Sequence, residues 1–304
     1  MNLRRIGITW MPSNSHGWGV FGLNLALTLI RNGPTTPMLF TKPMLIEPPS
    51  KVIDILAPFV EEQERLSADI QSNHELSFFK DTVLIHGLSD NFNHDEISNK
   101  VTGSHNVGFI FFENAAISDD AVKRSNKWDR ILVGSNWNKQ ICEEAGIKNV
   151  RCTAQGIDIE IFRPIPTKKN DGERFVVFSG GKLELRKGQD LVLEAFRIFN
   201  KLYPDSVLVT SWQNHWPQTI AAILESPFIN SLPSLNQNNK LDIVGWAEAH
   251  GVTRESIADT GWIPNSLIPE VLSHTDVALF PNRAEGGTNL AAMEAMACGI
   301  PCII

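Results

Sequence analysis

Two glutamates that flank a glycine-rich turn are the residues of this chain with the clearest potential for chemistry. Glu285 opens the turn, and Glu294 lies about one turn into the run of strong helix formers that follows. Backbone amides at a helix N-terminus are unsatisfied and carry partial positive charge, so they can hold a phosphate. The predicted amide donors are those of Gly287, Thr288, Asn289 and Leu290. Because helical side chains lean back toward the N-terminus, Glu294 can also accept hydrogen bonds from hydroxyls, and the pattern predicts a ligand that carries a phosphate and a sugar.

A strand, a turn, a helix and a second strand are needed to position these groups. The run 276–280 is short, apolar and followed by a proline, which is typical of a buried parallel strand. Gly299 stands where a glycine commonly ends a helix, and Pro301 prevents the helix from continuing. We therefore expect strand, glycine loop, helix and strand over residues 276–304.

This stretch resembles the E-G-x-G…E signature of retaining nucleotide-sugar glycosyltransferases of the GT-B fold, family-4 type. The resemblance implies that Glu285 contacts the transferred sugar, that Glu294 binds the nucleotide ribose and that loop amides hold the distal phosphate. Eight residues separate the two glutamates here, one more than the family usually has. The alternative is an ordinary buried α/β crossover with a capping glutamate, for which one acid in the loop and one in the helix are an unusual choice.

A second loop supplies positive charge. Lys182 and Lys187 follow a double glycine at the end of the predicted strand 175–179, and the segment resembles the family's G-[RK]…KG element. The resemblance implies that both lysines hold the donor diphosphate. A leaving nucleoside diphosphate gains negative charge, which fixed cations and amides stabilise without a metal ion. We expect Arg186 to face solvent, and a solvated surface lysine is the alternative for Lys187.

Glycines also cluster near the N-terminus, where Gly17, Gly19 and Gly22 fit the pattern G-x-G-x-x-G before an expected helix over residues 20–30. A dinucleotide site would need its tight turn directly after the first strand and an acidic residue about 20 positions later. Six residues separate Trp10 from Gly17, and the second predicted strand ends in Thr41-Lys42, which argues against a dehydrogenase. The resemblance instead implies that the loop around Gly19 touches the donor phosphate or the acceptor, while packing alone is the alternative for Gly22.

Two further candidates stand at predicted strand ends. His86 follows the strand 82–85, and Glu113 follows the strand 107–112. In open α/β sheets ligands bind beyond the carboxyl ends of the strands. The family places a histidine at such an end against the transferred sugar, and the resemblance puts Glu113 nearest that place, with His86 one strand away. We predict both as catalytic; the alternative for His86 is a hydrogen bond to a loop carbonyl.

The chain is predicted to form two Rossmann-like, doubly wound α/β domains that face a cleft, as in the GT-B fold. The polar run 166–174 is the best linker, so residues 1–165 are expected to form the acceptor-side domain and residues 166–304 the nucleotide-sugar domain. Family members continue beyond the strand at 301–304. The resemblance therefore implies that the second domain is incomplete and the chain truncated.

Composition restricts the class of partner. A net charge of −7 over 304 residues argues against a nucleic-acid binder. No apolar run approaches the ~18 residues of a membrane span, and the N-terminus lacks the apolar segment of a signal peptide. The four cysteines suit buried thiols better than a metal or redox site, so we expect a cytoplasmic protein without a metal.

The predicted function is hexosyl transfer from a UDP- or GDP-type sugar to an unidentified glycan, lipid or small-molecule acceptor, with retention of configuration and no cofactor. Peripheral contact with a membrane stays open. The main competing hypothesis is an impaired or truncated GT-B protein that binds a nucleotide sugar without transfer. The sequence also leaves open an epimerase, a phosphorylase, for which no pyridoxal-phosphate lysine motif is visible, and an NADP oxidoreductase built on residues 17–22.

Overall fold

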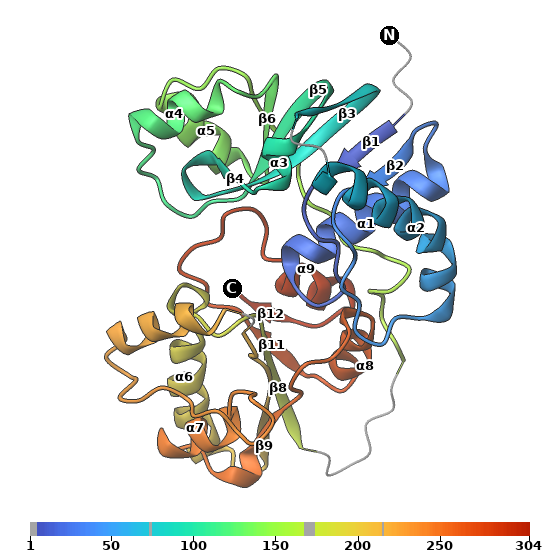
Figure 1. Cartoon of the computed structure of the whole chain (residues 1–304). Coiled ribbons are helices and arrows are strands. Elements are labelled where there is room, and N and C mark those ends of the chain that lie inside the picture. Colours follow the sequence, from blue (N-terminus) through green and yellow to red (C-terminus); the bar gives the residue numbers. More distant parts are fainter. Residues whose placement is uncertain (1–4, 73–74, 167–173, 215) are drawn as a thin grey trace. The chain divides into compact units, whose positions relative to one another are not determined.

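The computed structural model describes residues 5–72, 75–166, 174–214 and 216–304 (Figure 1). It contains two compact units, each of which we describe by itself. The first comprises Met1–Gly156 with Gly286–Thr288, and the second comprises Ile157–Glu285 with Asn289–Ile304. Most of the predicted linker, residues 167–173, lies outside the described residues.

A seven-stranded sheet forms the centre of the first unit. Its main strands are β1 (Arg5–Ile8), β2 (Thr36–Leu39), β3 (Ser77–Ser89), β5 (Val101–Ile110), β6 (Arg130–Val133) and β7 (Val150–Cys152). They are parallel in the order β2-β1-β3-β5-β6-β7, and β4 (Asn93–His94) pairs antiparallel with β3. The chain changes direction across the sheet between β1 and β3, which makes that position the topological switch point of this unit.

The helices of the first unit follow the strands as crossovers. They are α1 (Gly17–Asn32), α2 (Ser50–Ser72), α3 (Ile97–Lys100), α4 (Asp119–Ser125) and α5 (Asn136–Glu144), with a 3-10 turn η1 (Asp90–Phe92) after β3. Serine caps begin two of them, because the Ser118 hydroxyl accepts from the Ala121 amide and the Ser135 hydroxyl accepts from the Asn138 amide.

The second unit has a five-stranded parallel sheet. Its strands are β8 (Phe175–Gly180), β9 (Ser206–Ser211), β10 (Ile257–Asp259), β11 (Val277–Leu279) and β12 (Cys302–Ile303), in the order β10-β9-β8-β11-β12. The helices are α6 (Gln189–Leu202), α7 (Ile243–Ala249), α8 (Ile268–Ser273) and α9 (Leu290–Ala297). Short 3-10 segments are η2 (Leu185–Lys187), η3 (Pro217–Glu225), η4 (Arg254–Ser256) and η5 (Asn265–Leu267).

Helices cover both faces of this second sheet, α6 and α7 on one side and α8 and α9 on the other (Figure 1). Successive strand residues point to opposite faces, so the neighbours Val177 and Phe178 enter different cores. Both are at most 3% exposed, as expected for a sheet buried on two sides. The doubly wound α/β architecture predicted from the sequence is confirmed.

The predicted unit of strand, loop, helix and strand is present as β11, α9 and β12. Asn289 is the N-cap of α9, and its Oδ1 atom accepts from the Ala292 amide. Gly299 has a φ of +83° just beyond the C-terminal end, a conformation that favours glycine. The helix buries Ala292 and Ala295 against the sheet.

The segment before residue 166 differs from expectation. We expected residues 157–165 to end the first domain, but they belong to the second compact unit. Phe162 is 3% exposed and packs there with Leu272 and Ala278, while Ile157 and Ile161 contact the same core. Burial of these apolar side chains explains why the segment associates with the second sheet.

No helix in the described part of the chain is long and apolar enough to cross a membrane.

Candidate functional site

The switch point of the second sheet lies between β8 and β11, which are neighbours in the sheet although β9 and β10 come between them in the sequence. The loops that leave these two strands approach each other closely. A Cβ atom on Gly188 would lie 2.1 Å from the Pro281 carbonyl oxygen, so only a glycine permits this approach. Gly188 also has a φ of +76°. The sheet thus brings the predicted lysine loop and the predicted glutamate loop together at the edge where α/β folds bind ligands.

Glu285 is the centre of this contact. Its carboxylate accepts from the Arg186 guanidinium at 3.1 Å and from the Lys187 ammonium and the Asn282 side-chain amide. The Glu285 and Lys187 side chains are only 18% and 17% exposed, so their attraction is weakly screened by solvent. The side chains of Lys187 and Glu285 are therefore in direct contact, and their proposed roles toward a ligand stay predictions.

Arg186 corrects one expectation. We expected it to face solvent, but its side chain is 24% exposed and bridges two carboxylates, Glu285 at 3.1 Å and Glu184 at 2.9 Å. Lys182 lies 3.3 Å from the same Glu184 carboxylate and 5.2 Å from the centroid of the Trp216 ring. Lys182 and Arg186 thus share the Glu184 carboxylate, and Arg186 in turn contacts Glu285. We call these residues, together with Lys187, the Glu285 cluster.

An ion pair between a buried aspartate and a partly exposed arginine, missed in the sequence, holds the glutamate loop in place. Arg283 donates to both carboxylate oxygens of Asp190 at 2.8 and 2.7 Å, and Asp190 is 0% exposed. Burial acts to raise the pKa of Asp190, but hydrogen bonds from Arg283 and Ser226 hold it below its usual value. Arg283 also donates to the Leu185 carbonyl at 2.7 Å. The pair therefore connects the loop after β11 to the first turn of α6.

Glu294 lies inside α9, and its side chain is 7% exposed. Its Oε1 atom accepts from the Asn265 side-chain amide at 2.9 Å. Burial raises the pKa of Glu294 to about 7, and the hydrogen bond from Asn265 offsets this only in part. Near neutral pH this carboxylate is thus a hydrogen-bond acceptor whose ionisation is costly.

The predicted amide cradle is divided between the two units. Asn289 and Leu290 begin α9 in the second unit, whereas Gly287 and Thr288 group with the first, where the Thr288 hydroxyl donates to Gln155 Oε1 at 2.9 Å. The Asn289 Nδ2 atom is buried without a hydrogen-bond partner. A buried orphan donor at a helix N-terminus is suited to an anionic ligand.

Gly19 has a packing role in the first unit. Its amide donates to His16 Nδ1 at 3.1 Å, and a Cβ atom would lie 2.3 Å from Ser13 Cβ. Helix α1 begins at Gly17, not at Val20 as expected, because His16 caps this earlier turn. The glycine pattern is therefore part of a helix and not a turn that precedes one, and the Gly19 amide is already engaged.

His86 is not at a strand end, which corrects a second expectation. Strand β3 continues to Ser89 because Leu88 still pairs with Ile110 of β5. His86 is 1% exposed, its ring lies 4.6 Å from that of Trp128, and its Nε2 atom is 3.2 Å from Asn106 Oδ1. Burial lowers its pKa to about 4. At neutral pH His86 is an uncharged core residue.

Glu113 lies in the loop after β5, at the carboxyl end of the first sheet, and is partly exposed. Strand β5 ends at Ile110, two residues earlier than the predicted strand. Of the three candidates in the first half of the chain, Glu113 is therefore the one whose position fits a ligand-binding edge.

Metal ligands do not gather within the described ranges, where no group of three His, Cys, Asp or Glu side chains could hold an ion. The four cysteines are free thiols, and burial raises the pKa of Cys142 to about 12. Burial makes the Cys142 thiol an inert packing residue.

Known proteins resemble this chain in part of the sequence and in the fold. Residues 161–304 match the family model "Glycosyl transferases group 1". A search of curated proteins found no match. Among solved structures, sucrose-phosphate synthase from Thermosynechococcus elongatus is 14% identical with a TM-score of 0.58, covering 98% of this chain and 80% of that chain.

Two more solved structures resemble this chain to a similar degree. Anabaena Alr3699/HepE, in complex with UDP and glucose, is 12% identical with a TM-score of 0.58 and coverages of 98% and 80%. The E. coli trehalose-6-phosphate protein bound with UDP-2-fluoro glucose is 13% identical with a TM-score of 0.56 and coverages of 97% and 81%. The fold is therefore that of the GT-B glycosyltransferases. The glycosyl transferases group 1 match covers residues 161–304, which include Glu285 and the cations that contact it.

Proposed function

We propose that the protein transfers a hexosyl group from a nucleoside-diphosphate sugar to a hydroxyl of an acceptor, with retention of configuration and without a metal ion. The observation that carries this proposal is the Glu285 cluster: two cations converge on one carboxylate at the switch point of the second sheet. Retention and the family-4 type rest on the resemblance of the stretch that contains Glu285 and Glu294.

The donor is proposed to lie with its diphosphate near Lys182, Arg186 and Lys187. These cations and the amide end of α9 stabilise the negative charge that grows on the leaving group. The orphan Nδ2 donor of Asn289 gains a phosphate oxygen as its acceptor. Glu294 accepts from the ribose hydroxyls. The UDP groups held by two of the compared structures favour UDP over GDP as the nucleotide.

In the transfer step, the anomeric carbon exchanges its bond to the diphosphate oxygen for a bond to the acceptor oxygen. The acceptor's proton leaves to an oxygen of the departing diphosphate. Glu285 is proposed to hold hydroxyls of the transferred sugar. Arg186 and Lys187 hold its carboxylate in place through ion pairs. Glu113 is proposed on the acceptor side. His86, buried and neutral, is left out of the site.

Asn289→Asp tests the donor site without loss of the helix cap. Aspartate retains the oxygen that caps α9 but replaces the Nδ2 donor with a negative oxygen. We expect UDP affinity, measured by calorimetry, to fall about tenfold or more. The control Asn238→Asp, an exposed position of the same unit, makes the same charge change and should leave affinity unchanged.

The transfer step itself is tested by release of UDP from UDP-sugars in the presence of an acceptor panel. Product formation supports a transferase. Tight donor binding with no product from any acceptor would favour a GT-B protein that only binds the nucleotide sugar. Equal UDP affinity in Asn289→Asp and wild-type protein would count against the donor site.

A further inference from the structure

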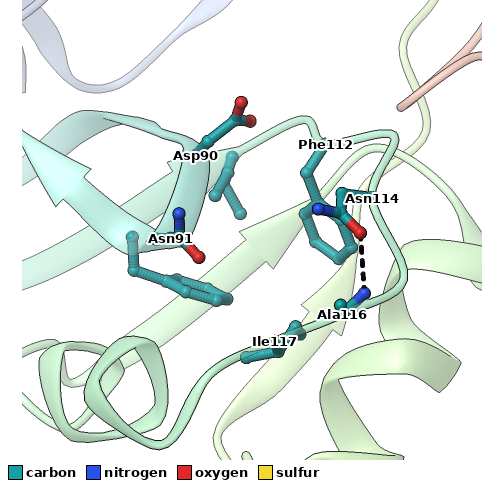
Figure 2. Close-up of a pocket in the computed structure, with 8 residues that line it drawn as sticks. Asp90, Asn91, Phe112, Asn114, Ala116 and Ile117 are labelled. Carbon is teal, nitrogen blue, oxygen red and sulfur yellow. Dashed lines mark hydrogen bonds between the residues drawn. The ribbon is translucent and has the colours of Figure 1, made fainter.

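A small pocket lies in the first unit where β3 and β5 end (Figure 2). Its volume is about 70 Å³, and none of its lining residues is a lysine or arginine. The floor is apolar, because Phe92, Ile110 and Phe112 are 1%, 1% and 4% exposed. The rim is polar and exposed, and it consists of Asp90, Asn91 and Asn114. We call this site the β3–β5 pocket. An apolar floor with a few polar groups at the rim is the usual composition of a ligand site.

The rim presents both hydrogen-bond donors and acceptors. Asn114 Oδ1 accepts from the Ala116 amide at 2.9 Å, which fixes the side chain and leaves its Nδ2 atom as a donor at the pocket. Figure 2 shows Asn91 on the opposite side of the pocket from Asn114, with Asp90 at the edge. In the described part of the chain the Asp90 carboxylate forms no ion pair. A carboxylate acceptor, a fixed amide donor and a second amide thus surround an apolar floor.

Backbone strain is concentrated at the same place. Asn91 and Phe92 have φ values of +59° and +58°, in the left-handed region that non-glycine residues rarely adopt. Such a conformation costs about 1 to 3 kcal/mol for each residue and is found preferentially at ligand sites. Here it places the Phe92 ring in the core while the Asn91 side chain stays at the rim. The turn therefore sets a polar side chain at the rim directly beside the apolar floor.

We propose that the β3–β5 pocket binds a hydroxymethyl group or two adjacent hydroxyls of a neutral sugar. Resting on the proposed function, we assign that sugar to the acceptor, which enters beside Glu113. The volume admits a few non-hydrogen atoms but not a whole sugar ring. A hydroxyl donates to Asp90 and accepts from Asn114, and the carbon that carries it contacts the apolar floor. A phosphorylated sugar is disfavoured, because Asp90 repels it and no lining cation attracts it.

Two substitutions test this pocket while keeping the local fold. Asn114→Asp retains the Oδ1 atom that accepts from Ala116 and removes the Nδ2 donor. Asn91→Gly removes the rim amide and relieves the positive φ, so it should fold at least as stably as the wild type. The matched control is Asn136→Asp, exposed at the start of α5 in the same unit.

The measurement is saturation-transfer NMR on methyl glucoside, methyl galactoside and methyl mannoside, with glucose 6-phosphate as the charged comparison. We expect at least one neutral glycoside to show transfer that falls about fivefold or more in Asn91→Gly and in Asn114→Asp but not in Asn136→Asp. Transfer that is absent for all three glycosides, or unchanged in both variants, would overturn the proposal. Equal transfer to glucose 6-phosphate would overturn the assignment to a neutral sugar.

UDP calorimetry on the same samples separates this proposal from the proposed function. UDP binding without a variant-sensitive glycoside signal would refute the pocket and leave the donor site standing. A variant-sensitive glycoside signal without UDP binding would refute the proposed transferase and leave the pocket as a sugar site.

Discussion

At the scale of single residues, Glu294 is a carboxylate that the fold makes costly to ionise. Its folded-state pKa of about 7 lies above the ordinary value of 4.5, so the folded protein binds more protons than the unfolded chain between these pH values. The stability that Glu294 contributes is therefore fully present below about pH 4.5, and it decreases as the pH rises toward 7. A pKa difference of this size corresponds to about 3 kcal/mol.

Glu294→Gln should consequently stabilise the protein at pH 8 and have little effect at pH 4.5. Glutamine keeps an oxygen for the Asn265 hydrogen bond and carries no charge to desolvate. Thermal melts at the two pH values measure the difference. UDP affinity should fall in the same variant, because a neutral amide is a weaker acceptor for ribose hydroxyls. A variant less stable than wild type at pH 8 would contradict the burial argument.

His86 has the opposite dependence on pH in the first unit. Its pKa is lowered from 6.5 to about 4, so the unfolded chain binds more protons in this range and stability is lost as pH falls from 6.5 to 4. Burial dominates this shift; Asn106, Lys127, Asp95 and His94 modify it.

We expect His86→Leu to remove most of the acid sensitivity of the first unit. Leucine occupies the buried position beside Trp128 without a group that must be protonated. Hydrogen exchange of β3 amides at pH 7 and pH 4.5 measures local stability in that unit. If wild type and variant lose protection equally at pH 4.5, another group is responsible for the acid sensitivity.

At the scale of elements, the loop after β11 depends on α6. Asp190 in the first turn of α6 holds Arg283, which lies two residues before Glu285. Asp190 is fully buried while Arg283 is 36% exposed, so removal of Arg283 leaves a buried carboxylate unpaired, whereas removal of Asp190 leaves a cation that water can still reach. Arg283 is a positioning residue in this account, since it acts on the ligand through Glu285.

Asp190→Asn should therefore raise the dissociation constant for UDP-sugar as well as lower stability. Combining it with Arg283→Met in a double-mutant cycle on both quantities isolates the pair. We expect the two changes to be strongly non-additive in UDP-sugar affinity. A pair that supports only the fold would show coupling in the unfolding free energy but unchanged affinity in every variant that remains folded.

At the scale of the whole molecule, local patterns predicted local units well. The periodicity and the proline and glycine positions around residues 276–304 predicted β11, α9 and β12. These are short-range signals, which a sequence carries locally. Cytoplasmic location and the absence of a cofactor stay predictions.

The errors came from pairing between distant segments. Arg283 and Asp190 are 93 residues apart, and nothing near either residue indicates its partner. His86 was placed at a strand end because the local apolar run stops at Ile85, whereas pairing with β5 extends β3 to Ser89. Arg186 is separated from its partner Glu285 by 99 residues, so the sequence around Arg186 gives no sign of the ion pair that takes it out of solvent. The order of the strands in the second sheet brings the partners of the two ion pairs together.

If the switch point of the second sheet binds a diphosphate, UDP and uridine should differ in affinity, and calorimetry with both ligands measures that difference. We predict that UDP binds and that uridine binds at least about tenfold more weakly, because the cations of the Glu285 cluster recognise phosphate. Lys187→Met should remove most of this difference while leaving uridine binding unchanged. Equal affinity for UDP and uridine, or an unaltered difference in Lys187→Met, would show that these cations do not bind a diphosphate.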